Sequence, residues 1–190
     1  MKEREPMTMR PATGMAKRTS LTRCKIGLLG IFGICISVVA LATPGAGVLS
    51  NIISRATVGP FHVESESGPT GKSGERENQR TWEVELQAQG ISDIVTQTIT
   101  FAPGGFTGWH SHPGPALLSI KSGTLTFYEA SDPTCTPHVF PAGTGFVEPG
   151  GDVHFARNEG TADLTLNVTY IVPQSAPQRI DQPTPGNCPF

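Results

Sequence analysis

Between residues 81 and 172 the chain consists of short segments in which apolar and polar residues alternate. Turn residues separate these segments. In DLTLNVTYIV every second residue is apolar from Leu164 through Tyr170, which places these side chains on one face of an extended strand. The sequence contains 22 glycines and 17 prolines, a composition that favours turns between short strands over long helices. The pattern therefore predicts an all-β fold, built as an antiparallel sandwich or barrel.

Glycine-containing turns divide this region into further strand candidates. The segment TWEVELQA at 81–88 alternates apolar and polar residues, which predicts a half-buried strand. Gly123 separates ALLSIKS from TLTFYEA, and the turn at 149–151 separates TGFVE from DVHFARN. We expect a β-hairpin at each of these two turns.

The first 42 residues carry the pattern of a targeting segment. Seven Lys or Arg and two Glu in residues 1–25 give a net charge of +5, and a charge-free apolar run follows at 26–42. The run ends in a small-x-small pattern, so residues 1–42 are predicted to be a signal peptide or a helical membrane anchor. We expect an extracytoplasmic protein, either secreted or anchored to the membrane by residues 26–42.

Composition divides the remaining chain into three parts. Residues 43–80 are expected to form an N-terminal arm with a polar flexible loop, because ESESGPTGKSGERENQR at 64–80 cannot bury apolar surface. Residues 81–172 are expected to form the β-barrel, and residues 173–190 a proline-rich C-terminal tail. After residue 25 the net charge is −7, which argues against nucleic-acid binding.

Two cysteines, Cys135 and Cys188, follow the targeting segment. An even pair in an oxidising compartment favours a disulfide, which would fasten the tail to a loop of the barrel. The alternative is a pair of metal ligands, but the long separation and the absence of a CxxC spacing argue against it.

Two histidines one residue apart, in GWHSHPG, are the strongest chemical signal in the chain. In a strand His110 and His112 project from the same face, about 7 Å apart along the backbone, which allows both rings to reach one metal ion. His154, just after the PGG turn, is the candidate third ligand. The alternative is a turn with histidines that face solvent.

The residues around these histidines form two motifs with characteristic spacing. The first comprises Gly104, His110, His112 and Gly123. The second comprises Gly143, Pro149, Gly151, His154 and Asn158. In this order and spacing the chain resembles a small exported member of the cupin superfamily. The resemblance implies a double-stranded β-helix, or jelly-roll barrel, with the histidines lining its interior. It also implies a divalent transition metal, such as Fe, Mn, Zn or Ni.

The first motif departs from the cupin pattern at one position. The family usually has a glutamate that is separated from the second histidine by three or four intervening residues, where this chain has Ala116 and Leu117. Glu148, in the second motif, is a candidate replacement ligand. The alternative is an ordinary strand residue, because its neighbour Val147 competes for the inward face.

These observations leave two main functions open. One is a metal-dependent enzyme, an oxygenase or isomerase that acts on a small anionic molecule, with Glu148 as a weak candidate for the general base. The other is a non-catalytic module that binds a metal or small ligand at the cell surface. The fold cannot decide between them, because this superfamily has many activities. The resemblance to cupins also makes a homodimer a possible oligomeric state.

Overall fold

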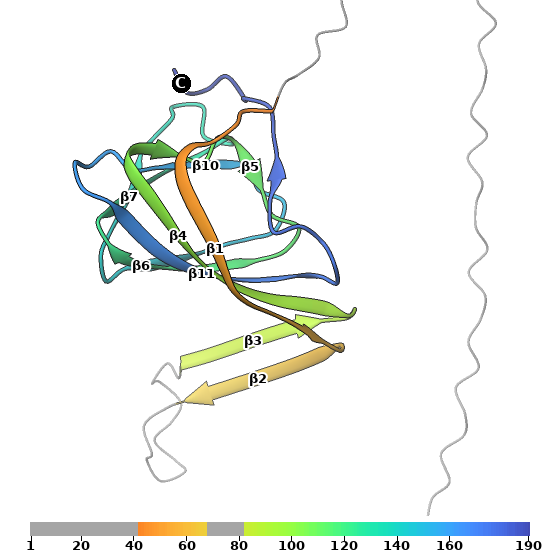
Figure 1. The fold of residues 1–190 in the computed structure, drawn as a ribbon. Helices are drawn as coiled ribbons and strands as arrows, with labels where there is room; N and C mark the ends of the chain where they lie inside the picture. The colour runs from red at the N-terminus through yellow and green to blue at the C-terminus, as the bar shows by residue number, and fades with distance from the viewer. Residues whose placement is uncertain (1–41, 68–81) are drawn as a thin grey trace, which may run out of the picture. The chain divides into compact units, whose positions relative to one another are not determined.

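The computed structural model describes residues 42–67 and 82–190 and confirms the all-β prediction (Figure 1). Its strands are β1 (Ala46–Val58), β2 (Phe61–Ser67), β3 (Trp82–Ala88), β4 (Ser92–Phe106), β5 (His110–Ser111), β6 (Ala116–Ser122), β7 (Thr124–Glu129), β8 (His138–Pro141), β9 (Gly145–Glu148), β10 (His154–Arg157), β11 (Leu164–Pro173) and β12 (Ile180–Asp181).

Ten of these strands form one sheet that curves into a nearly closed jelly-roll barrel (Figure 1). One layer contains β1, β4, β11, β6 and β9, and the other contains β12, β5, β10, β7 and β8. The layers join where Arg157 of β10 pairs with Phe106 at the end of the long strand β4. The barrel interior therefore lies between the inward faces of the two layers.

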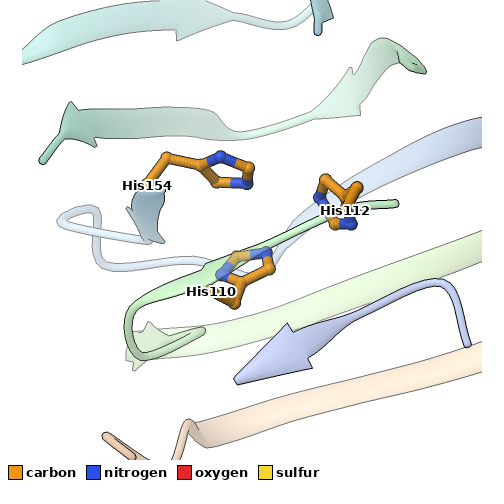
Figure 2. Close-up of side chains that lie close together, drawn as sticks. All are labelled: His110, His112 and His154. Carbon is orange, nitrogen blue, oxygen red and sulfur yellow. The ribbon is translucent and has the colours of Figure 1, made fainter. Parts of the chain in front are cut away.

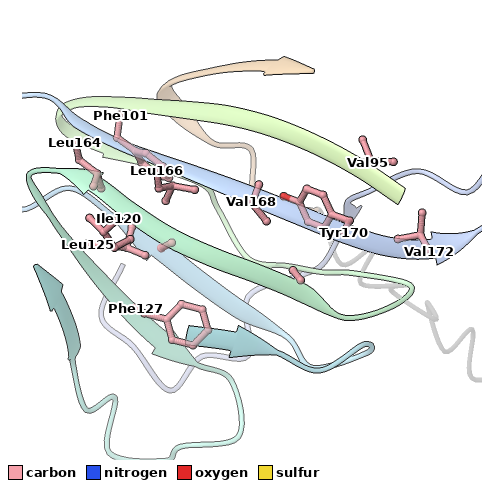
Figure 3. Packing of buried hydrophobic residues seen from close by; sticks show 12 residues of the cluster. Val95, Phe101, Ile120, Leu125, Phe127, Leu164, Leu166, Val168, Tyr170 and Val172 are labelled. Carbon is pink, nitrogen blue, oxygen red and sulfur yellow. The ribbon is translucent and has the colours of Figure 1, made fainter. Parts of the chain in front are cut away.

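Alternating residues from both layers fill one end of the interior. Along β11, Leu164 through Val172 are buried at every second position, as the sequence pattern predicts. They pack against Val95 and Phe101 of β4 and against Leu125 and Phe127 of β7 (Figure 3). Each such apolar side chain contributes about 1.5–3 kcal/mol when it leaves water, so this cluster is a major source of barrel stability.

The two expected hairpins are absent, and both predictions were wrong. β6 pairs with β9 and β11, whereas β7 pairs with β8 and β10, so the chain crosses between layers at Gly123. Gly123 has a φ of 77°, and a Cβ atom there would lie 2.8 Å from the Cα of Leu164. A second crossing separates β9 from β10 at Gly151, where φ is 93°. Each strand pairs within its own layer and so buries its inner face. The alternation of apolar and polar residues predicts the strand but does not reveal its pairing partner.

The segments before β4 differ in two ways from their expected arrangement. β1, in the stretch expected to be an arm, pairs with β4 along its length and belongs to the barrel sheet. β3 instead pairs with β2 in a separate two-stranded sheet, where Leu86 remains 40% exposed. The strand predicted at TWEVELQA is thus present, but β2 is its only pairing partner among the described residues. Residues 64–67 of the expected loop lie in β2, and 68–81 fall outside the described residues.

Strand pairing and a disulfide both fasten the C-terminal tail to the barrel. β12 pairs with β5, opposite His110 and Ser111. Farther along, Cys188 forms the predicted disulfide with Cys135. A disulfide is typical of proteins in an oxidising, extracytoplasmic compartment.

The predicted signal or anchor segment lies outside the described residues. Within residues 42–67 and 82–190, no helix has the length and apolar character needed to cross a membrane.

Removing the disulfide should lower the melting temperature. The two cysteines are 53 residues apart, and closing a loop of this length stabilises the fold by about 4 kcal/mol in the chain-entropy model. The variant Cys135→Ser/Cys188→Ser should therefore melt on the order of 10 °C lower in a calorimetric scan. Adding a reductant should lower the melting temperature of the wild type but leave that of the variant unchanged. Equal melting temperatures for wild type and variant would contradict the expected role of the bond.

Candidate metal centre

The three predicted histidines meet in the barrel interior. His110 on β5 and His154 on β10 are direct cross-strand partners, and His112 follows one residue after β5. The ring centroids are 4.4 Å apart for the first pair, and each lies 5.0 Å from that of His112 (Figure 2). One nitrogen from each ring lies within 4.8 Å of the others, which is close enough for all three to bind a single ion.

Each ring is oriented by a hydrogen bond to a backbone carbonyl. The Nδ1 atoms of His110 and His154 lie 3.0 Å from the carbonyl oxygens of Gly108 and Asp152, each two residues earlier. Nδ1 of His112 bonds the carbonyl oxygen of Gln178 in the tail. A carbonyl oxygen only accepts, so each Nδ1 carries a hydrogen and donates it. A neutral ring with its hydrogen on Nδ1 has a free lone pair on Nε2, and this is the form that ligates metals.

Glu148 brings a carboxylate into the same cluster. Its Oε2 atom lies 3.1 Å from Nε2 of His112, and its Oε1 atom lies 3.5 Å from Nε2 of His154. Glu148 is 6% exposed, whereas Val147 is 64% exposed, so the glutamate occupies the inward face of β9. In the register of β6 and β9, Glu148 stands directly opposite Ala116, a position where the cupin pattern usually has its glutamate. The small Ala116 side chain leaves room for a carboxylate from the neighbouring strand.

These donor atoms fit a cation. Nε2 of His154 is buried and has no hydrogen-bond partner within the described part of the chain. In the neutral rings Nε2 is an acceptor, so the contacts with the Glu148 oxygens place acceptors against acceptors. A metal ion or a proton between them would remove this repulsion. Three imidazoles and one carboxylate are a donor set suited to divalent Zn, Fe, Mn or Ni.

Burial favours the neutral state of His110 and His154, which is the state that metal binding requires. Desolvation lowers the pKa of His110 well below its usual 6.5, and the nearby His154, Arg179 and His112 lower it further. Desolvation also lowers the pKa of His154, although the Glu148 carboxylate opposes this change. Burial, followed by the Glu148 charge, raises the pKa of the Tyr170 phenol, which keeps its hydroxyl protonated.

Two cavities reach the histidine cluster from different sides. One, of about 310 Å³, contacts His154 and Glu148 and extends between β7, β8 and β9. The other, of about 380 Å³, contacts His110 and His112 and is bounded by β1, β4 and the tail. A small molecule in either cavity would lie beside the candidate ligands.

The remaining described histidines lie outside this centre. His138 is exposed at the start of β8. His62 on β2 lies 3.2 Å from carboxylate oxygens of Glu64 and Glu85, a contact that its position in the sequence did not suggest. All three members of this second group are exposed, with side-chain exposures of 47%, 66% and 59%.

Asn158 has the structural role expected from its place in the second motif. Its buried amide nitrogen donates to the carbonyl oxygens of Phe101, Ala102 and Ala162. Its side-chain oxygen accepts from the backbone of Gly160. These bonds tie the end of β10 to β4, so Asn158 supports the centre without entering it.

Comparison with known proteins gives a family match and several similar folds. The family model described as "Cupin domain" matches residues 97–172. A double-stranded β-helix protein from Klebsiella pneumoniae is 20% identical over 46% of this chain and 73% of its own, with a TM-score of 0.40. An oxalate oxidase in complex with the substrate analogue glycolate is 26% identical over 46% and 45%, with a TM-score of 0.40. The Bacillus subtilis oxalate decarboxylase is 22% identical over 46% and 23%, with a TM-score of 0.41. The chain thus spans less than half of either oxalate enzyme. Among curated protein sequences no match was found.

The stability of the metal-free protein should decrease as the pH falls below the usual histidine pKa of 6.5. The unfolded chain takes up protons in this range while His110 and His154 stay neutral in the fold, so acid favours unfolding. Each histidine contributes up to about 1.4 kcal/mol per pH unit. Urea titrations with a chelator at pH 8 and pH 5.5 measure this difference.

The double variant His110→Gln/His154→Gln should show a smaller loss between these two pH values. His138→Gln, which alters an exposed histidine outside the centre, serves as the control and should keep the wild-type dependence. The same loss in the double variant as in the wild type would contradict this assignment.

Proposed function

Residues 97–172 of this chain form a cupin domain, and we propose that its barrel binds one divalent transition metal ion. His110, His112 and His154 would hold the ion, with Glu148 as the fourth ligand. The observation that carries the proposal is the convergence of three buried imidazoles, two of which have Nε2 beside the buried Glu148 carboxylate. No hydrogen-bond donor of the described chain satisfies Nε2 of His154.

The position of Glu148 restores the donor set that the first motif lacks. Three neutral imidazoles alone would leave both charges of a divalent ion uncompensated, whereas a carboxylate offsets one of them. The remaining coordination positions would be open to water or to a ligand from the adjoining cavities, as in catalytic metal sites. Iron, manganese, zinc and nickel all suit this donor set.

We propose that the centre is enzymatic and acts on a small anionic molecule, as an oxygenase or an isomerase. A bound ion supplies Lewis acidity, or a place where substrate and oxygen meet. The chain's own residues would orient the ligand set through the Nδ1 bonds to backbone carbonyls. A non-catalytic module that binds a metal or small ligand is the alternative, and turnover distinguishes the two.

We further propose that the protein works outside the cytoplasm, either secreted or held at the membrane by residues 26–42. The Cys135–Cys188 disulfide supports an oxidising compartment.

The purified chain should carry about one equivalent of transition metal, measured by elemental analysis. Glu148→Gln keeps the size of the side chain and removes its charge, so metal affinity should fall at least 10- to 100-fold. Glu129→Gln is a matched control, because Glu129 lines the same cavity but is exposed. A protein that remains metal-free after incubation with Fe, Mn, Zn and Ni would refute the proposal.

Turnover separates an enzyme from a binding module. The metal-loaded protein would be incubated with a panel of small carboxylic acids, with and without oxygen, and products followed by NMR. An enzyme should convert at least one acid, and His110→Ala should lower the rate at least about 100-fold. Thermal stabilisation by an acid without any conversion would favour the binding module instead.

A further inference from the structure

The cavity beside His110 and His112 has a wall made by the C-terminal tail. Gln178 and Arg179 line it, directly before β12. Tyr170, which lies next to His112 with ring centroids 5.0 Å apart, lines it from β11. The tail thus contributes polar side chains to the same space that the candidate ligands face.

The tail presents hydrogen-bond donors to this cavity. Nε2 of Gln178 is buried and has no partner in the part of the chain that the structure describes. Leaving such a donor unpaired costs about 1–3 kcal/mol, which a bound acceptor would recover. The neighbouring Arg179 guanidinium is fixed by two bonds, from Nη2 to the carbonyl oxygen of Thr107 and from Nε to the carboxylate of Asp181. Neither bond uses Nη1.

The tail is held firmly enough to act as a binding wall. The backbone of Gln182 donates to the carbonyl oxygen of Trp109, and its side chain donates to Ser111. The backbone carbonyl of Gln178 also accepts a hydrogen bond from His112. One residue therefore orients a candidate metal ligand and also carries the donor side chain. A ligand bound by Gln178 and Arg179 would therefore lie beside the metal.

The charges around the cavity indicate the class of ligand. Asp181 offsets Arg179, and Glu148 offsets one charge of a divalent ion, which leaves a single positive charge near the cavity. The protonated Tyr170 hydroxyl adds a neutral donor. One positive charge with several donors suits a monoanion better than a dianion such as sulfate.

We infer that Gln178 and Arg179 form a subsite for a small monocarboxylate, which spans the tail donors and the metal centre. The inference deepens the proposed function and depends on it for the share of the charge that the metal supplies. Arg179 is then the residue that determines specificity for an anion over its neutral amide.

Acetate is the test ligand, acetamide its neutral isostere and sulfate its dianionic competitor. Titrations of the metal-loaded full chain, followed by the ¹H–¹⁵N NMR signals of the Gln178 side-chain amide, should show acetate binding at least about tenfold tighter than either alternative. Arg179→Gln should weaken acetate binding about tenfold while leaving metal content unchanged. Gln178→Ala should also weaken it, and it keeps the backbone carbonyl that orients His112.

Arg55→Gln is the matched control. Arg55 also pairs with an aspartate, Asp93, and its side chain is 35% exposed against 34% for Arg179, but it does not line this cavity. It should bind acetate as the wild type does. Equal acetate affinities in Arg179→Gln and Arg55→Gln, or equal affinities for acetate and acetamide, would overturn the inference.

The same titrations on chelator-treated protein separate this inference from the proposed function. Acetate should bind more weakly to this protein, because the metal supplies the net positive charge, and whatever binding is left should still depend on Arg179. Full metal content without any acetate binding would refute only the subsite. Absence of metal together with Arg179-dependent acetate binding would refute only the metal proposal.

Discussion

Three hydrogen bonds from imidazole Nδ1 atoms to backbone carbonyls determine how the three histidine rings are oriented in the barrel interior. Each bond fixes both the rotation of a ring and the position of its hydrogen, so the Nε2 lone pairs face one another. The accepting carbonyls belong to Gly108, Asp152 and Gln178, in three separate segments of the chain. The chemistry of the centre therefore depends on how the barrel and its tail are held together, as well as on the histidines themselves.

Much of the fold and of the site was predictable, because it depends on short-range patterns. Period-two alternation over 164–172 predicts a strand with one buried face, and the structure has it. The spacing between His110 and His112 predicts two rings on one face, and the family motifs predict His154 as the third. The hairpins were mispredicted at Gly123 and Gly151 for a physical reason. A sharp turn between strands fixes a local change of direction, but the pairing partner depends on which layer buries each strand.

Contributions from outside the motifs were harder to predict. The tail was expected to be a proline-rich extension, yet Gln178 and Arg179 line a cavity at the centre. Local composition does not indicate that the tail pairs with β5, because the paired residues are far apart in the sequence, Ile180 with Ser111 and Asp181 with His110. The orientation of Glu148 could have been inferred from Phe146, two residues earlier, which packs towards the core. The competing apolar Val147 obscured that signal.

The pairing of Ala116 with Glu148 has a consequence for how such centres are recognised. The two positions are direct cross-strand neighbours, so a carboxylate on either strand can project into the same part of the interior. A search along a single strand would classify this barrel as lacking its acid. A search over adjacent strands would find a buried carboxylate, Glu148, beside two of the histidines.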